Sequence, residues 1–313
     1  MSILLILFIV VCFLAYSNGA NDNFKGVATL FGSNTTKYKG AIIWATITTF
    51  LGSIVSIFLA NELVQNFSGK GLIPQELVME PEFALSIAFG AALTVFIATK
   101  IGMPISTTHG LVGGLFGSGV MAVGSSFNFV KLGSVFLIPL LVSPLMACIV
   151  SLIGYLIFKR LRIASGLTKE SCICVDNEYK PLSEYTNEKG EVQINSDSKC
   201  HITASIKEKC EKRYIGKIVG INAQKVLDYA HYLSAGVVSF SRGLNDTPKM
   251  VGLLLVLNTM NIKWGMISVT VAIAVGGLVN ARKVGETVSK KVTSMNHGQG
   301  FTANMFTGLL VTT

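Results

Sequence analysis

The feature that most constrains this chain is an internal repeat, in which a polar motif set in apolar sequence occurs twice, 224 residues apart. Residues 17–62 align without a gap onto residues 241–286, with 15 identities in 46 positions. Each copy contains Gly-x-Asn-Asp, at Gly19–Asp22 and again at Gly243–Asp246. Repeated membrane segments with matched polar interruptions are typical of secondary transporters. The repeat therefore predicts two equivalent halves and a function in transport.

The composition is that of a membrane protein. Half of the residues are hydrophobic, only 14% are charged, and the mean hydropathy is +0.57. A soluble domain of this length would carry far more charge, so we expect an integral, multi-pass protein of the plasma (inner) membrane, surrounded by the lipid bilayer. Of the net charge of +9, +4 comes from one central segment, residues 159–225, so the charge indicates topology and does not indicate nucleic-acid binding.

The apolar runs predict an all-α polytopic membrane fold. A helix needs about 20 apolar residues to cross a bilayer. The runs at 38–60, 132–158 and 262–281 are long enough alone. Shorter runs flank the two polar motifs, which predicts one broken helix in each half. The glycine-rich run at 104–122 opens on a proline and is predicted to be re-entrant.

Loop charges orient the two halves. Loop 61–82 holds one lysine and four glutamates, whereas its repeat counterpart 281–300 holds four basic residues and one glutamate. Because Lys and Arg stay on the cytoplasmic side, these equivalent loops are predicted to lie on opposite sides of the membrane. The halves are therefore predicted to be inverted-topology repeats.

Three segments follow from this pattern. Residues 1–158 are expected to form the first membrane repeat, residues 159–225 a cytoplasmic polar loop, and residues 226–313 a second membrane repeat that is expected to be incomplete at its C-terminus. The polar loop holds 13 Lys and Arg, and its centre, at 184–199, has the composition of a flexible loop.

The polar loop also contains a cysteine cluster, which offers soft ligands to a zinc ion. The candidates are Cys172, Cys174, Cys200 and Cys210, with His201 beside them. Cys-x-Cys is tighter than the spacing of zinc fingers, so reduced cytoplasmic thiols are favoured over a metal site.

Two aspartates, Asp22 and Asp246, are the strongest candidates for chemistry. A carboxylate at membrane depth costs several kcal/mol unless it is paired, hydrated or bound to a cation. Each follows an asparagine, Asn21 or Asn245, whose side-chain carbonyl suits sodium and takes up no proton. We therefore expect these four residues to bind coupling cations, sodium in preference to protons. A helix-end turn at the membrane surface is the plainer alternative for one such motif, but two copies in inverted contexts disfavour it.

A hydroxyl-rich element follows Pro104 and is predicted to begin a helix inside the membrane. Ser106, Thr107 and Thr108 would place hydroxyl donors beside the unpaired N–H groups and the positive dipole of a helix N-terminus, which suits an anion. His109 is expected to bond a neighbouring carbonyl. An ordinary capped helix start at the membrane surface remains the alternative.

Four further charged residues occupy equivalent repeat positions. Lys25 and Lys249 follow the aspartates by three positions, so they lie on nearly the same helical face and either pair with the carboxylates or draw an anion inward. Glu62 and Glu286 lie at a helix end and are further candidates for cation coupling.

An enzymatic function is disfavoured. Ser106 and His109 are three residues apart, as a nucleophile and its base could be, but no acidic residue follows to orient the histidine. A hydrolase also gives no reason for a duplicated Asn-Asp. We expect no enzyme activity and no cofactor.

At these residues the chain resembles the PiT family of inorganic phosphate transporters. The signature Gly-Ala-Asn-Asp stands at Gly19–Asp22 and recurs at Gly243–Asp246, and the Pro-x-Ser-Thr-Thr-His element stands at Pro104–His109. The resemblance implies symport of phosphate with sodium or protons by alternating access, often as a homodimer. The residues expected to hold phosphate are Ser106, Thr107, Thr108, Asp22 and Asp246.

One departure from the family pattern is expected to matter. The second hydroxyl-rich element would begin about seven residues after Thr313, so the chain is expected to be truncated at its C-terminus and not to transport in this form. Transport of another oxyanion, such as sulfate, and a non-transporting phosphate sensor on a transporter fold remain alternatives.

Overall fold

The structure is a computed structural model that describes residues 3–59, 64, 67–166, 171–177, 185–186, 192–193, 200–206, 219–257, 261–292 and 295–312. Its contacts divide the chain into two compact units, one formed by Met1–Tyr155 with His231–Thr313 and the other by Leu156–Ala230. The first unit thus holds most of the residues predicted to form the two membrane repeats, and the second holds the predicted polar loop with a few residues on either side of it.

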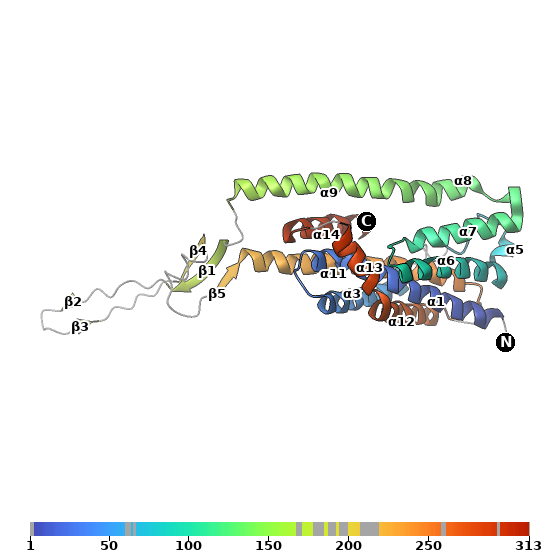
Figure 1. The fold of residues 1–313 in the computed structure, drawn as a ribbon, viewed down its shortest axis with the longest axis horizontal. Coiled ribbons are helices and arrows are strands. Elements are labelled where there is room, and N and C mark those ends of the chain that lie inside the picture. The colour runs from blue at the N-terminus through green and yellow to red at the C-terminus, as the bar shows by residue number, and fades with distance from the viewer. Residues whose placement is uncertain are drawn as a thin grey trace. The chain divides into compact units, whose positions relative to one another are not determined.

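Helices build the membrane unit (Figure 1). The first repeat contains α1 (Ile3–Asp22), a 3-10 segment (Asn23–Val27), α2 (Ala28–Gly32), α3 (Tyr38–Leu59), α5 (Gln75–Val78), α6 (Pro81–Ile101) and α7 (Thr107–Val123). A 3-10 segment (Gly124–Ser126), α8 (Phe129–Leu132), a π-helical segment (Gly133–Leu137) and α9 (Ile138–Ala164) follow. The second repeat contains α11 (Ala223–Val251), a 3-10 segment (Gly252–Leu254), α12 (Ile262–Asn280), α13 (Arg282–Glu286), a π-helical segment (Thr287–Lys291) and α14 (His297–Thr312).

Five helical stretches in the described part of the chain are long and apolar enough to cross a membrane. They are Ile3–Gly32, Tyr38–Leu59, Pro81–Ile101, Phe129–Ser165 and Ile262–Asn280. They carry large side chains on exposed surfaces, such as Phe58 and Leu141, each about seven-tenths exposed, as expected of residues that face lipid. The predicted all-α polytopic membrane fold is confirmed.

Glycines let α1 of the first repeat approach α12 of the second. A Cβ on Gly19 would lie 1.9 Å from the carbonyl oxygen of Ile273, and a Cβ on Gly276 would lie 1.9 Å from that of Tyr16. Only glycine fits at both positions. Close approach through small residues is a common way for helices to pack in membranes.

The same contact occurs a second time between α3 and α11. A Cβ on Gly243 would lie 2.0 Å from the carbonyl oxygen of Thr49, and a Cβ on Gly52 would lie 1.9 Å from that of Phe240. These four residues are the repeat counterparts of the four in the first contact. Each repeat therefore packs its first helix against the second helix of the other repeat, in a two-fold arrangement.

Equivalent helices of the two repeats run in opposite directions. Asp22 lies beside Arg242 of α11, and Thr29, seven residues later, bonds to His231, earlier in α11. Residue numbers thus rise along the first broken helix as they fall along α11. This antiparallel relation is the one expected of inverted repeats.

The two repeats differ at their helix breaks. The first copy changes from α-helix to 3-10 helix directly after Asp22, as the sequence predicts. In the second copy α11 continues through Gly243–Asp246, so the predicted break there is wrong, and the α-helix gives way only at Gly252–Leu254. Gly243 instead serves the close approach to Thr49, which requires no unwinding of the helix.

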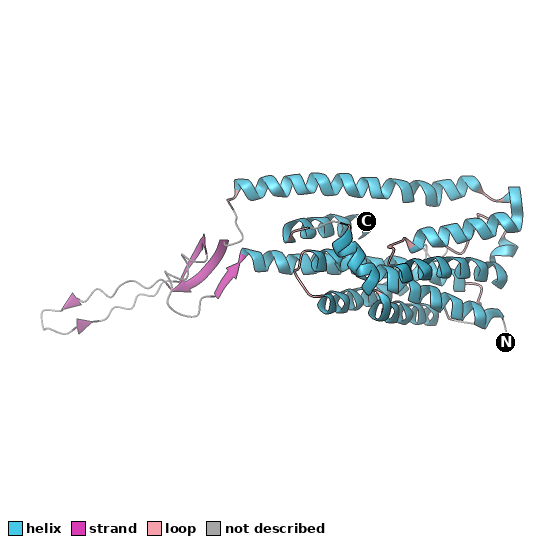
Figure 2. Cartoon of the chain, viewed as in Figure 1, coloured by secondary structure: helices cyan, strands magenta, loops and turns pink. Residues whose placement is uncertain are grey.

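The polar segment contains strands that the sequence analysis did not predict (Figure 2). β1 (Ser171–Asn177) pairs antiparallel with β4 (Cys200–Ile206) and β5 (Val219–Asn222) in the order β4-β1-β5. Two short strands, β2 (Tyr185–Thr186) and β3 (Val192–Gln193), pair within the region predicted to be flexible. Alternating β-branched residues in β1 and β4 favour strands, a local signal that the charge of the segment obscured.

The cysteine cluster lies partly in this sheet. In backbone register Cys172 pairs with Ser205 and Cys174 with Thr203, whereas Cys200 pairs with Asn177 at the end of β1. Cys210 lies outside the described residues. The preference for reduced thiols over a metal site at these cysteines stays a prediction.

We expect Gly276→Ala to lower the thermal stability of the protein in detergent, because its Cβ would meet the Tyr16 carbonyl and force α1 and α12 apart. Overpacking of this kind costs about 1–3 kcal/mol. Gly90→Ala is the matched control, since its Cβ would have no described atom within 4 Å. Equal melting temperatures for the two variants would contradict the close helix contact.

Candidate functional site

The site is built around the tip of a helical hairpin formed by α6 and α7. The two helices pack antiparallel, with Ser86 donating to Ser118 at 2.8 Å. Gly102 ends α6 with a φ of 78°, a left-handed conformation that glycine adopts without strain. The tip, residues 102–106, then runs without helical structure until α7 begins at Thr107.

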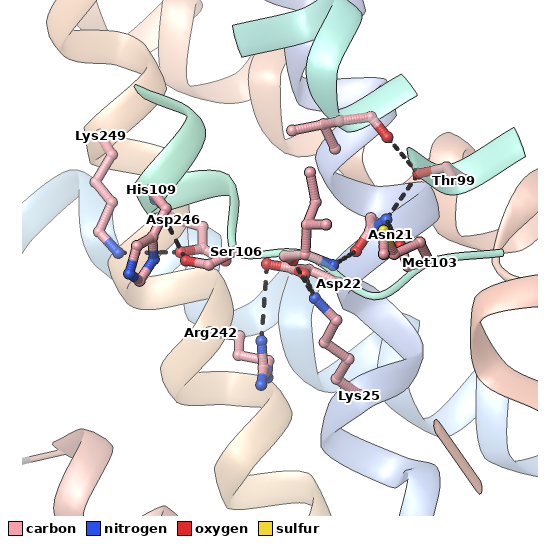
Figure 3. A network of polar contacts seen from close by, with 12 residues as sticks. Asn21, Asp22, Lys25, Thr99, Met103, Ser106, His109, Arg242, Asp246 and Lys249 are labelled. Atoms are coloured by element: carbon pink, nitrogen blue, oxygen red, sulfur yellow. Dashed lines mark hydrogen bonds and ion pairs between the residues drawn. The ribbon is translucent and has the colours of Figure 1, made fainter. Parts of the chain in front are cut away.

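Asn21 holds this tip in place (Figure 3). Its amide nitrogen donates to the Thr99 hydroxyl at 2.9 Å and to the Met103 carbonyl at 3.0 Å. Its amide oxygen accepts from the Ile105 backbone N–H at 3.1 Å. The side chain is 0% exposed, so these bonds use both ends of the amide. Asn21, predicted as a cation ligand, is thus occupied as a tether of the hairpin tip.

The two Asp-Lys pairs of the repeat converge on the same tip. Lys25 pairs with Asp22 and also donates to the carbonyl of Ile105. Lys249 lies 3.2 Å from an Asp246 carboxylate oxygen and donates to the Thr108 hydroxyl at 2.9 Å. Both lysines thereby neutralise a carboxylate and bond to the element that the sequence predicts to bind an anion.

Arg242 is a further cation of the site that the sequence analysis missed. Its Nη1 lies 3.8 Å from the second carboxylate oxygen of Asp22. Its Nε is buried and has no hydrogen-bond partner among the residues that the structure describes. The alignment of the two repeats could have identified it, because Arg242 is a charged residue at the position equivalent to the neutral Asn18.

A cavity of 290 Å³ lies among these groups. Its lining residues are Asp22, Lys25, Ile105, Ser106, Thr108, Arg242, Asn245, Asp246, Lys249 and Val311. The three basic side chains exceed the two carboxylates by one positive charge. Both repeats contribute to the wall, the first one also through the hairpin tip and the start of α7, so a group bound here would contact both repeats.

The N-terminus of α7 opens beside this cavity. Ser106 is the N-cap, and its hydroxyl accepts from the backbone N–H of His109 at 3.3 Å. Ser106 and Thr108 line the cavity, as predicted for anion ligands, but Thr107 does not. Thr107 is buried, and its hydroxyl has no partner in the described part of the chain. The bond that His109 makes to Ser106 comes from its backbone and not from its ring.

A second, much smaller void of 10 Å³ lies next to the cavity. Its lining residues are Asn18, Asp22, Asn23, Thr49, Arg242, Gly243, Asp246 and Ile273. Asn18 is 2% exposed, and its amide oxygen has no hydrogen-bond partner among the described residues. Asn18 precedes Asp22 by one helical turn, and this spacing could have identified it from the sequence.

The remaining candidates lie elsewhere or serve other contacts. Glu286 pairs with Arg282 at 3.0 Å on the surface, with 44% of its side chain exposed, so its predicted role in cation coupling is not supported by its position. Glu62 lies outside the described residues. Asn245 lines the cavity and donates to the Val311 carbonyl at 3.2 Å.

Comparison with known proteins gives one family. The sequence pattern of the "Phosphate transporter family" matches residues 18–313. A protein of Pyrococcus furiosus named "Putative phosphate permease" is 25% identical over 342 residues, covering 99% of this chain and 81% of its own length. A "Sodium-dependent phosphate transporter" of Plasmodium falciparum is 30% identical over 155 residues, covering 48% of this chain and 22% of its own.

One solved structure has the same fold. Its title is "The sodium-dependent phosphate transporter", and it superposes with a TM-score of 0.70 over 99% of this chain and 84% of its own. The two sequences are 22% identical, a level at which the likeness shows the fold alone.

We expect Asn21→Ala to free the hairpin tip, because three hydrogen bonds worth about 1 kcal/mol each are lost. Hydrogen–deuterium exchange of the peptide covering residues 102–106 should accelerate at least about tenfold. Asn128→Ala, which removes the cap of α8 far along the chain, is the control and should leave this peptide unchanged. Unchanged exchange in Asn21→Ala would contradict the tether.

Proposed function

We propose that this chain, which belongs to the phosphate transporter family, carries inorganic phosphate across the membrane together with sodium. The observation that carries the proposal is the 290 Å³ cavity, in which three basic side chains meet the N-terminus of α7 between two inverted repeats. Proteins of this family are transporters and permeases, so an enzymatic reading is excluded.

Phosphate suits the chemistry of this cavity. Lys25, Lys249 and Arg242 offer charged donors, and Ser106 and Thr108 offer hydroxyls beside the helix N-terminus. A helix N-terminus with free backbone N–H groups is a ready anion site. The two carboxylates leave an excess of only one positive charge, so a bound anion is attracted without being held too tightly for release.

Sodium suits the small void beside the cavity. Asn18 presents an unpartnered amide oxygen, and Asp22, Asn23 and Thr49 add oxygen atoms around it. Amide oxygens coordinate a hard cation but take up no proton in the physiological range. This ligand chemistry supports sodium over protons, and it favours Asn18 and Asn23 over Asn21 as ligands of the proposed cation site.

The inverted repeats support alternating access. The cavity wall comes from equivalent positions of both repeats, so rocking of one repeat against the other would open it first to one side and then to the other. The hairpin tip is joined to α1 by Asn21 and to Lys25, and the start of α7 is joined to Lys249 of the second repeat, so this part of the hairpin is the element that such a motion would displace.

The test is phosphate uptake into proteoliposomes, driven first by a sodium gradient and then by a proton gradient. We expect sodium-driven uptake by a form of the chain extended at its C-terminus, and we expect Asp22→Asn with Asp246→Asn in that form to lower it at least about tenfold, because both carboxylates lose their charge. Glu286→Gln, outside the cavity, is the control. Uptake that survives the double substitution would sink the proposal, and uptake driven only by protons would make the aspartates proton carriers.

Selection between oxyanions is a separate question. We expect unlabelled arsenate to compete with labelled phosphate for uptake, and a tenfold excess of sulfate to compete far less, because sulfate has no proton to donate to Asp22 or Asp246 in the cavity wall. Equal competition by sulfate would favour a general oxyanion transporter. A protein that binds phosphate but moves none under either gradient would favour the sensor alternative.

A further inference from the structure

The small void is lined by equivalent positions of the two repeats. Six of its eight lining residues form three repeat-related pairs, which are Asn18 with Arg242, Asp22 with Asp246, and Thr49 with Ile273. The aspartates are the same in both repeats, and the other two pairs differ. The symmetric backbone thus presents different chemistry on its two sides.

The first-repeat side is a set of oxygen ligands. Asn18 has a buried amide oxygen without a partner in the described part of the chain, and Asp22 supplies a carboxylate. The Thr49 hydroxyl donates to the Asn23 amide oxygen at 2.9 Å, which leaves the hydroxyl lone pairs available to a cation. Oxygens of these types are the ligands of hard cations.

The second-repeat side has lost those ligands and gained a charge. Ile273 stands in the place of Thr49 and offers no side-chain oxygen. Arg242 stands in the place of Asn18, and its Nη1 lies 3.8 Å from Asp22 across the void. Both differences make this side less suited to bind a cation. Each removes an oxygen ligand, and one of them adds a guanidinium that stays protonated.

We propose that Arg242 is a built-in cation that replaces one mobile coupling sodium on the second-repeat side of this void. The proposal rests on the proposed sodium-coupled function, but it concerns how many sodium ions bind with each phosphate. A void of 10 Å³ holds about one small ion or water, so a fixed charge beside it leaves room for a single sodium on the Asn18 side.

The charge balance supports this assignment. Each aspartate already has a lysine, Lys25 or Lys249, that also bonds to the hairpin tip and faces the anion cavity. Arg242 lines both the cavity and the void, so its charge acts on the cation site as well as on the anion. A sodium ion placed against the guanidinium would be repelled, whereas one beside Asn18 and Asp22 would be attracted.

The experiment measures the phosphate dissociation constant of the purified protein as a function of sodium concentration. The slope of its logarithm against the logarithm of sodium concentration reports the number of sodium ions bound with phosphate. For Arg242→Asn combined with Ile273→Thr, which copies the first-repeat ligands onto the second side, we expect the slope to steepen by one. A tenfold fall in sodium would then weaken phosphate binding about tenfold more than in the parent protein.

Three controls separate this role from others. Arg242→Lys keeps a charge at the position and should retain the parent slope. Arg282→Asn removes a basic residue on the surface and should also retain it. Arg242→Gln with Ile273→Thr is a second neutral variant, and sodium-dependent shifts in melting temperature without phosphate provide an independent readout of the extra ion.

The outcomes are distinct. An unchanged slope in both neutral variants, with phosphate binding weakened equally at every sodium concentration, would overturn the proposal and make Arg242 a simple phosphate ligand. The parent protein could instead show a slope of zero that rises to one in the two neutral variants. That result would contradict sodium coupling of the natural protein, but it would still support the replacement of a sodium ion by Arg242.

Discussion

The central physical constraint on this molecule is the enclosure of two carboxylates. Asp22 lies in a helical stretch, Ile3–Gly32, that is long and apolar enough to cross a membrane, and Asp246 lies in α11; only 10% and 14% of their side chains are exposed. An uncompensated charge at that depth is costly, so the surrounding structure has to supply positive charge. Lys25 and Lys249 do so from one helical turn away, and Arg242 does so across the repeat boundary. The excess positive charge that results is what makes the cavity attractive to an oxyanion.

This charge cluster depends on close helix packing. The glycine contacts bring α1 against α12 and α3 against α11, and each contact joins helices of different repeats. The first helix of each repeat, α1 or α11, carries the Asn-Asp motif. Because each of these helices packs against a helix of the other repeat, both motifs come together within one unit. Bulkier residues at these glycines would separate the helices and, with them, the two aspartates.

Much of the site could be predicted from the sequence because the repeat marks equivalent positions. Asp22, Asp246 and the hydroxyls of Ser106 and Thr108 do lie around one cavity. The tether made by Asn21 could not be predicted, since its partners are 78 to 84 residues away and two of its three bonds involve backbone atoms. The continuous α11 was missed because the motif glycine was interpreted as a point of unwinding, when it is needed for packing.

The contacts of the hairpin tip bear on leakage. Lys25 belongs to the first repeat and bonds to Ile105 in the tip, whereas Lys249 belongs to the second and bonds to Thr108 in the first turn of α7. In the proposed alternating-access motion, this part of the hairpin could not follow both repeats, so at least one lysine would lose its bond and leave its charge less well compensated. An anion held between the lysines would accept from whichever one is released. Under the proposed mechanism the transition would therefore be easier for a loaded carrier than for an empty one, which would limit the movement of the coupling ion without phosphate.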